Sequence, residues 1–192
     1  MRVRKILLAL ATIVVLIISV KLITDPGFVS RWRHHSEIFG PLASEMRFLR
    51  RSQVDIQLFE GLPHPTTEKK TFNAELERVT EKDYDGHKFY EGKITLNEAD
   101  ASAVFALLTT ADGFRQTLGV KFCGGFHPDW MVDLERKGTS IECYCCFGCG
   151  EVEFRSGGAS VHVDMTNATA MQLHSLLSKY RSSRPVLGEF EQ

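Results

Sequence analysis

The fold of this chain is decided by residues 129–146, DWMVDLERKGTSIECYCC. Apolar and polar side chains alternate on both sides of Lys137-Gly138, and this period of two marks half-buried strands. A two-residue Lys137-Gly138 turn joins the two strands, with Gly138 taking the positive φ that such turns require. The sequence therefore predicts a β-hairpin.

Counting outward from the turn gives the register of the predicted hairpin. The expected pairs are Leu134 with Ile141, Val132 with Cys143, Trp130 with Cys145, and Asp129 with Cys146. Because successive side chains point to opposite faces, the first three pairs fall on the apolar face and the last falls on the other. Cys143 and Cys145 are thus predicted as core residues.

The rest of the chain predicts an α+β domain with one antiparallel sheet. A second hairpin, turning at Gly157-Gly158, extends the first into a four-stranded meander, and alternating patterns at 54–58 and 89–96 predict two earlier strands. Residues 66–87, which are polar with little periodicity, are expected to form an irregular surface excursion. Two helices are predicted to pack on one face of the sheet. The first follows an Asn97 cap and ends near 111, and the second spans 168–181 after Thr166 or Asn167.

The amino-terminal segment carries the features of a transmembrane helix. Arg2, Arg4 and Lys5 precede an apolar run over 6–23, which as a helix measures about 27 Å, close to a hydrocarbon core of about 30 Å. The basic cluster predicts a cytoplasmic amino terminus and an exported remainder in a single-pass protein of the cell membrane. A cleaved signal peptide is the alternative, although no A-x-A site follows the run.

These features divide the chain into four predicted parts. Residues 1–23 form the membrane anchor or signal peptide, with the lipid bilayer as partner of residues 6–23. Residues 24–52 form a juxtamembrane linker with a short helix at 42–51. Residues 53–181 form the exported α+β domain, and 182–192 form a tail.

The charge of the exported part argues against a nucleic-acid partner. The chain has 23 basic and 24 acidic side chains, and four of the basic ones lie at or before Lys21. The remainder therefore has a net charge of −5. A nucleic-acid-binding surface would need a basic excess instead.

One interpretation of the remaining cysteines is a zinc site. Cys146-Phe147-Gly148-Cys149-Gly150 resembles the knuckle of zinc ribbons, and Cys123 and His127 complete a Cys3His set that zinc accepts. Asp129 is a candidate to orient His127 through its second nitrogen, or to replace it as ligand. Structural zinc contributes on the order of 10 kcal/mol to folding, so such a site would dominate the stability of the domain.

A disulfide is the competing interpretation, because the predicted compartment is oxidising. A bond from Cys123 to Cys146 or Cys149 would close a loop of about 25 residues and contribute roughly 3 to 4 kcal/mol. Direct bonding of Cys146 to Cys149 would give a redox-active pair. An odd count of five cysteines leaves at least one thiol unpaired in either case.

Two classes of function remain open from the sequence. The first is a membrane-tethered extracytoplasmic binding or structural module of unknown partner, stapled by the metal site or by the disulfide. The second is an exported zinc-dependent or thiol-redox enzyme centred on the same cluster, with Asp129 as base of a hydrolytic site. The sequence holds no Gly-rich phosphate loop and names no substrate.

The pair of motifs Cys-Gly-Gly-Phe-His-Pro-Asp at 123–129 and Cys-Phe-Gly-Cys-Gly at 146–150, with Leu-Phe-Glu-Gly-Leu-Pro-His at 58–64, resembles an uncharacterised family of bacterial exported or membrane-anchored proteins. The resemblance covers about residues 54–180 and implies no activity. It does imply that the turn at 61–65 belongs to the same site. His64 then becomes a candidate extra ligand, or a group that holds a ligand in place, with a surface histidine as the alternative.

Overall fold

The structure is a computed structural model, and it describes residues 2–25, 27–50, 53–84, 86–117 and 125–185. Its centre is a seven-stranded antiparallel sheet in the order β4-β1-β6-β7-β8-β9-β5. The strands are β1 (Asp55–Glu60), β4 (Ile94–Thr95), β5 (Phe114–Gln116), β6 (Trp130–Arg136), β7 (Thr139–Cys146), β8 (Glu151–Ser156) and β9 (Ala159–Met165). The short hairpin of β2 (Glu81–Tyr84) and β3 (His87–Tyr90) forms a separate two-stranded sheet.

The predicted meander is confirmed in register. Trp130 pairs with Cys145, Val132 with Cys143, and Leu134 with Ile141, while Val152 pairs with Val163 in the second hairpin. Lys137 and Gly138 both adopt positive φ, of 48° and 78°, as a two-residue hairpin turn requires. Local alternation and turn chemistry were therefore sufficient to place four strands.

The mixed α+β class is also confirmed, with more helices than the sequence indicated. They are α1 (Arg2–Thr24), α2 (Phe28–Phe39), α3 (Ala43–Leu49), α4 (Lys69–Arg78), α5 (Glu98–Thr109) and α6 (Asn167–Ser178), with short 3-10 helices η1 (Gly40–Leu42) and η2 (Ala111–Gly113). Asn97 caps α5 by accepting from the Asp100 N–H at 2.8 Å, and Thr166 caps α6.

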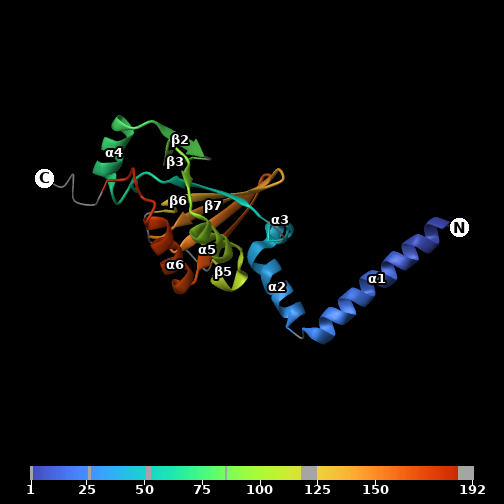
Figure 1. Cartoon of the computed structure of the whole chain (residues 1–192). Helices are drawn as coiled ribbons and strands as arrows, with labels where there is room; N and C mark the ends of the chain where they lie inside the picture. The colour runs from blue at the N-terminus through green and yellow to red at the C-terminus, as the bar shows by residue number, and fades with distance from the viewer. Residues whose placement is uncertain (1, 26, 51–52, 85, 118–124, 186–192) are drawn as a thin grey trace.

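One face of the sheet is covered by α2, η1, α3, α5 and α6 (Figure 1), and the main core lies between them and β6–β9. Three phenylalanine rings join distant segments there. Phe39 of α2 packs against Phe114 at 6.0 Å and Phe154 at 5.5 Å between ring centroids. Residues 24–52 were expected to form a solvated linker, but this segment supplies Phe39, Leu42, Met46 and Leu49 to the core.

The opposite face, called here the open face, is covered only in part. The β2–β3 hairpin lies over a small apolar cluster of Phe59, Phe89, Met131 and Tyr144. The sequence predicted one strand over 89–96 and an irregular excursion over 66–87. In the structure, the predicted strand over 89–96 is divided between β3 and β4. Much of the segment 66–87 forms α4 and β2.

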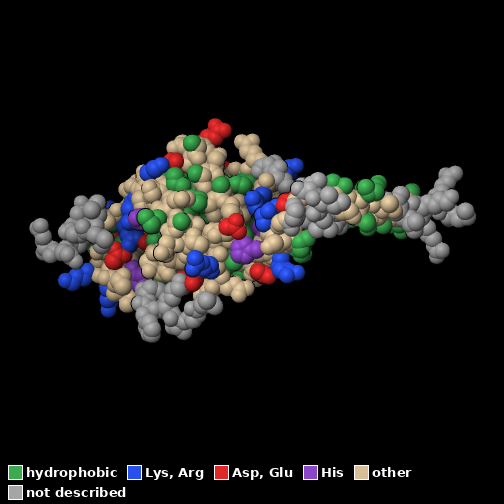
Figure 2. Space-filling view, turned by 90° about the horizontal axis from the view of Figure 1, so that it is seen from below, with side chains coloured by type: hydrophobic (Ala, Val, Ile, Leu, Met, Phe, Trp, Pro, Cys, Tyr) green, Lys and Arg blue, Asp and Glu red, His purple; other side chains and the backbone are tan. Residues whose placement is uncertain are grey.

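The helix α1 extends away from the sheet domain, and green apolar side chains are exposed along it (Figures 1 and 2). Within the described residues, no helix meets the combined length and hydropathy of a membrane span. The predicted transmembrane helix over 6–23 is therefore not supported by the structure.

Candidate functional site

The four cysteines that the structure describes fall into two pairs, as the alternation predicted. Cys143 and Cys145 are fully buried in the main core, where burial raises the pKa of both thiols well above the usual range. Both pack as small apolar side chains on the helix-covered face. Cys146 and Cys149 lie elsewhere, in the tight turn between β7 and β8 that we call the cysteine turn, residues 146–149.

The cysteine turn brings the two sulfur atoms together. The backbone N–H of Cys149 donates to Sγ of Cys146 at 3.2 Å, and the thiol of Cys149 donates to the carbonyl oxygen of Gly125 at 3.5 Å. The backbone of His127 supplies a further hydrogen bond to Sγ of Cys146. Burial raises the pKa of the Cys146 thiol by more than the hydrogen bonds to its Sγ lower it, so the pKa lies above its ordinary value.

His127 is buried beside this turn and is held by a backbone carbonyl. Its Nε2 lies 2.8 Å from the carbonyl oxygen of Leu62. A carbonyl only accepts, so Nε2 carries the hydrogen and the lone pair of the neutral ring is on Nδ1. Leu62 thus makes the contact that the sequence analysis assigned to Asp129. Burial is the main cause that lowers the pKa of His127.

His64 lies against His127, with 4.9 Å between ring centroids, so the turn at 61–65 does reach this site. Nδ1 of His64 accepts from the backbone N–H of Thr66 at 3.0 Å and of Thr67 at 3.2 Å. The neutral ring must then carry its hydrogen on Nε2, which leaves no lone pair there for a metal. Nε2 is buried and has no hydrogen-bond partner among the residues described.

Asp129 is engaged with the backbone and with the carboxyl-terminal segment. Its Oδ2 accepts from the backbone N–H of Phe147 at 2.8 Å, which fixes the cysteine turn, and its Oδ1 accepts from Arg184 at 2.9 Å. The guanidinium of Arg184 also contacts the carboxylate of Glu68. Both oxygens of Asp129 are therefore occupied, and a role as free base has no support in this arrangement.

The segment 182–184 was expected to begin a tail, but it is anchored beside the site. The carboxylate of Glu60, 1% exposed, accepts from the backbone N–H groups of Ser182, Ser183 and Arg184 at 2.9 to 3.1 Å. Neither Glu60 nor Arg184 was among the predicted site residues. No local pattern marks such a contact, because its partners are more than 120 positions apart.

Within the described part of the chain, no group of three His, Cys, Asp or Glu side chains gathers closely enough to hold a metal ion. The remaining predicted ligand, Cys123, lies outside the described residues. The zinc site and the disulfides of Cys123 therefore stay predictions. What the structure does bring together is Cys146, Cys149 and the backbone of His127.

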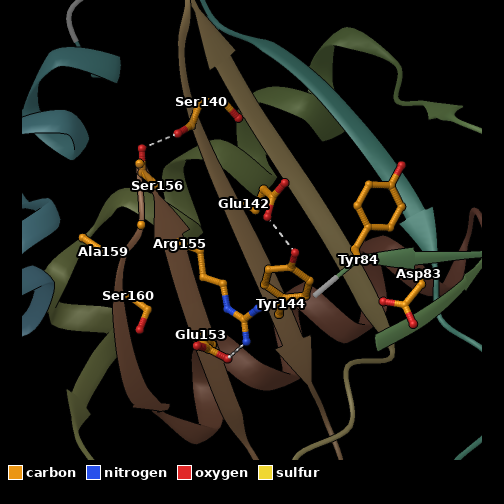
Figure 3. A pocket seen from close by; sticks show the side chains of 12 residues that line it. Asp83, Tyr84, Ser140, Glu142, Tyr144, Glu153, Arg155, Ser156, Ala159 and Ser160 are labelled. Carbon is orange, nitrogen blue, oxygen red and sulfur yellow. Dashed lines mark hydrogen bonds and ion pairs between the residues drawn. The ribbon is translucent and has the colours of Figure 1, made fainter. Parts of the chain in front are cut away.

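A groove on the open face, with a volume of about 710 Å³, is the second feature of interest (Figure 3). Its floor is formed by β7, β8 and β9, and the β2–β3 hairpin contributes one wall. The lining side chains are polar or aromatic: Asp83, Tyr84, Ser140, Glu142, Tyr144, Glu153, Arg155, Ser156 and Ser160. The sequence analysis missed the groove, because the groove depends on how the β2–β3 hairpin folds over the sheet.

Several of the groove side chains are fixed by one another. The hydroxyl of Tyr144 donates to Glu142 at 2.6 Å, and Arg155 donates to Glu153 at 2.8 Å (Figure 3). The guanidinium of Arg155 also lies over the Tyr144 ring, 4.8 Å from its centroid. Three carboxylates and one guanidinium line the groove, so its charge is negative.

Comparisons with known proteins add little to this geometry. No family model matches the chain, and no curated protein matches it. Its structure is similar to that of a putative lipoprotein from Clostridium perfringens, with a TM-score of 0.40 and 7% sequence identity over 71% of this chain and 89% of the other. A likeness this weak carries no argument about function.

Proposed function

We propose that this protein is a membrane-tethered, extracytoplasmic binding module that holds a positively charged ligand in the groove of the open face. The observation that carries the proposal is the groove itself, whose volume of about 710 Å³ falls within the usual range of ligand sites. The proposal has two parts, a binding surface and a tether, and each has its own test.

The lining of the groove favours a cation. Asp83, Glu142 and Glu153 outnumber the single Arg155, which is already paired with Glu153. We therefore expect the ligand to present lysine or arginine side chains, as an extended basic segment of a protein partner would.

The tether in this proposal is α1. Large apolar side chains along it are half or more exposed: Ile6, Leu7, Leu10, Ile13, Val14, Val15, Leu16, Ile17 and Val20. So large an exposed apolar surface is unfavourable in water, and lipid is the partner that removes it. The basic residues Arg2, Arg4 and Lys5 before the run support an orientation with the domain outside the cytoplasm.

In this proposal the cysteine turn has a structural role. Its burial favours that role over a role as an active centre. Cys146 is 2% exposed, Cys149 8% and His127 8%, so these side chains present little surface on which a substrate could bind. The zinc-enzyme alternative would need an open ligand position and a free base. Asp129, its predicted base, is committed to Arg184 and to Phe147.

Binding is tested with the full chain in detergent micelles and tetralysine as the probe. We expect saturable binding that weakens severalfold in Glu142→Gln and Asp83→Asn, which keep the hydrogen bonds to Tyr144 and Gly86. Binding should also weaken from low salt to about 0.15 M, where exposed charges are screened beyond about 8 Å. The control is Glu77→Gln, an exposed carboxylate on α4. Equal affinity in all variants would contradict the proposal.

The tether is tested by flotation with vesicles of neutral lipid. We expect the full chain to float with the vesicles, and a variant with Leu10, Val14 and Ile17 changed to Asn to remain at the bottom. Protease added outside intact cells should degrade the sheet domain if it is exported. Protection of the domain in intact cells, with digestion after lysis, would rule out the proposed orientation.

A further inference from the structure

We propose that Cys146 and Cys149 form a reversible disulfide across the cysteine turn, by exchange with a small disulfide such as oxidised glutathione. The inference does not depend on the ligand of the groove. It concerns a covalent site within the described residues, distinct from the predicted bonds of Cys123.

Three hydrogen bonds hold the turn and the Cys149 side chain in place, which limits how far the two sulfurs can separate. The Phe147 N–H is held by Asp129 Oδ2 at 2.8 Å, and the Cys149 N–H by Cys146 Sγ at 3.2 Å. The thiol of Cys149 also donates to the Gly125 carbonyl at 3.5 Å. Because Sγ of Cys146 already contacts the backbone N–H of Cys149, we expect bond formation to require only a local movement of the turn.

The two cysteines differ in the roles they can take. Cys149 is the more exposed, so it meets the oxidant first. Sγ of Cys146 receives hydrogen bonds from the backbone of Cys149 and of His127, and such bonds stabilise a thiolate. Burial has the opposite effect and raises the pKa of the Cys146 thiol, so little thiolate is present at neutral pH. We therefore expect exchange to be slow at neutral pH and faster in alkaline solution.

The exchange proceeds in two balanced steps. The thiolate of Cys149 attacks one sulfur of the oxidant, forms a mixed disulfide and releases one thiolate. The thiolate of Cys146 then attacks the Cys149 sulfur, closes the turn and releases the second thiolate. The protein loses two electrons and two protons, and the oxidant becomes two thiols.

The neighbouring thiols provide an internal control. Cys143 and Cys145 point to the helix-covered face and are fully buried, and burial raises the pKa of both. Successive side chains of β7 point to opposite faces of the sheet, so Cys146 and Cys145 lie on different faces although they are adjacent in sequence. Neither core thiol is expected to react in the folded protein.

Mass spectrometry distinguishes the outcomes. The full chain is equilibrated with oxidised glutathione, quenched with acid, alkylated under denaturing conditions and cut with trypsin. Cleavage after Lys121, Arg136, Lys137 and Arg155 separates peptide 122–136, with Cys123, from 138–155, with the other cysteines. We expect 138–155 to lack two alkyl groups relative to the fully alkylated peptide, to be two hydrogen masses lighter than a peptide with two free thiols, and to give no backbone fragments between Cys146 and Cys149. Dithiothreitol added before alkylation should reverse these changes.

Substitutions test the assignment. Cys149→Ser should abolish the mass loss, and Cys143→Ala should retain it, each after its near-ultraviolet circular dichroism has shown a folded protein. The proposal is overturned by a cross-link between 122–136 and 138–155, or by full alkylation after oxidation. It is also overturned if the chain, purified without chelator, holds one equivalent of zinc that protects these thiols from the oxidant.

Discussion

The guanidinium of Arg184 donates to the carboxylate of Asp129 at 2.9 Å, and thereby joins the carboxyl-terminal segment to the start of β6. The Arg184 side chain is 7% exposed and also contacts Glu68. Asp129 in turn holds the cysteine turn through the Phe147 N–H. The carboxyl-terminal segment therefore stabilises the same turn that carries the reactive thiols.

We expect Arg184→Ala to lower the free energy of unfolding by about 2 kcal/mol, since it leaves the partly buried carboxylates of Asp129 and Glu68 without their cation. Chemical denaturation monitored by tryptophan fluorescence measures this change. The control is Lys179→Ala, whose side chain is 55% exposed in its pair with Asp100 and whose loss should cost less than about 1 kcal/mol. Similar costs for the two variants would show that Arg184 is not a buried anchor.

The meander could be predicted because its determinants are local. Alternation assigns each side chain to a face, and Lys137-Gly138 and Gly157-Gly158 fix where the strands turn. The same alternation separated Cys143 and Cys145 from Cys146. The family resemblance made His64 a candidate extra ligand, and in the structure its ring lies 4.9 Å from that of His127, between ring centroids.

The remaining features could not be predicted because their determinants are distant or masked by composition. Arginine and histidine dominate 31–51, and their charge concealed the apolar stripe of Phe39, Leu42, Met46 and Leu49. The hydrogen bond of Leu62 to His127 comes from a backbone carbonyl, which no residue type identifies. The groove depends on the hairpin over the open face, and therefore on tertiary structure.

Phe39 tests whether α2 is part of the folded domain. We expect Phe39→Ala to cost about 3 to 5 kcal/mol, because it leaves a cavity beside Phe114 and Phe154. Thermal unfolding followed by circular dichroism would measure the loss. Trp32→Ala, on the same helix but 52% exposed, is the matched control and should be nearly neutral. If Phe39→Ala were also neutral, α2 would be a linker after all.

Gly61 tests the close approach of two backbones at the histidine pair. Its N–H donates to the Asp129 carbonyl at 2.9 Å, and a Cβ at this position would overlap the carbonyl oxygen of Pro128. We expect Gly61→Ala to destabilise the fold by about 2 kcal/mol or more, because backbone atoms cannot move aside as a flexible side chain can. Gly148→Ala, where a Cβ meets nothing within 4 Å, is the control in the same denaturation experiment.

His35 gives the protein a specific acid sensitivity. It is buried against Phe39, and burial, followed by the charges of Arg47, Arg50 and His34, lowers its pKa to about 4. The unfolded chain takes up this proton near pH 6.5 and the folded one only near pH 4, so stability falls as pH decreases between these values. The full loss is about 3 kcal/mol at 1.36 kcal/mol per pKa unit. Denaturation from pH 7 to pH 4 should therefore show a smaller decline for His35→Leu than for the wild type. Parallel curves would show that His35 protonates equally in both states.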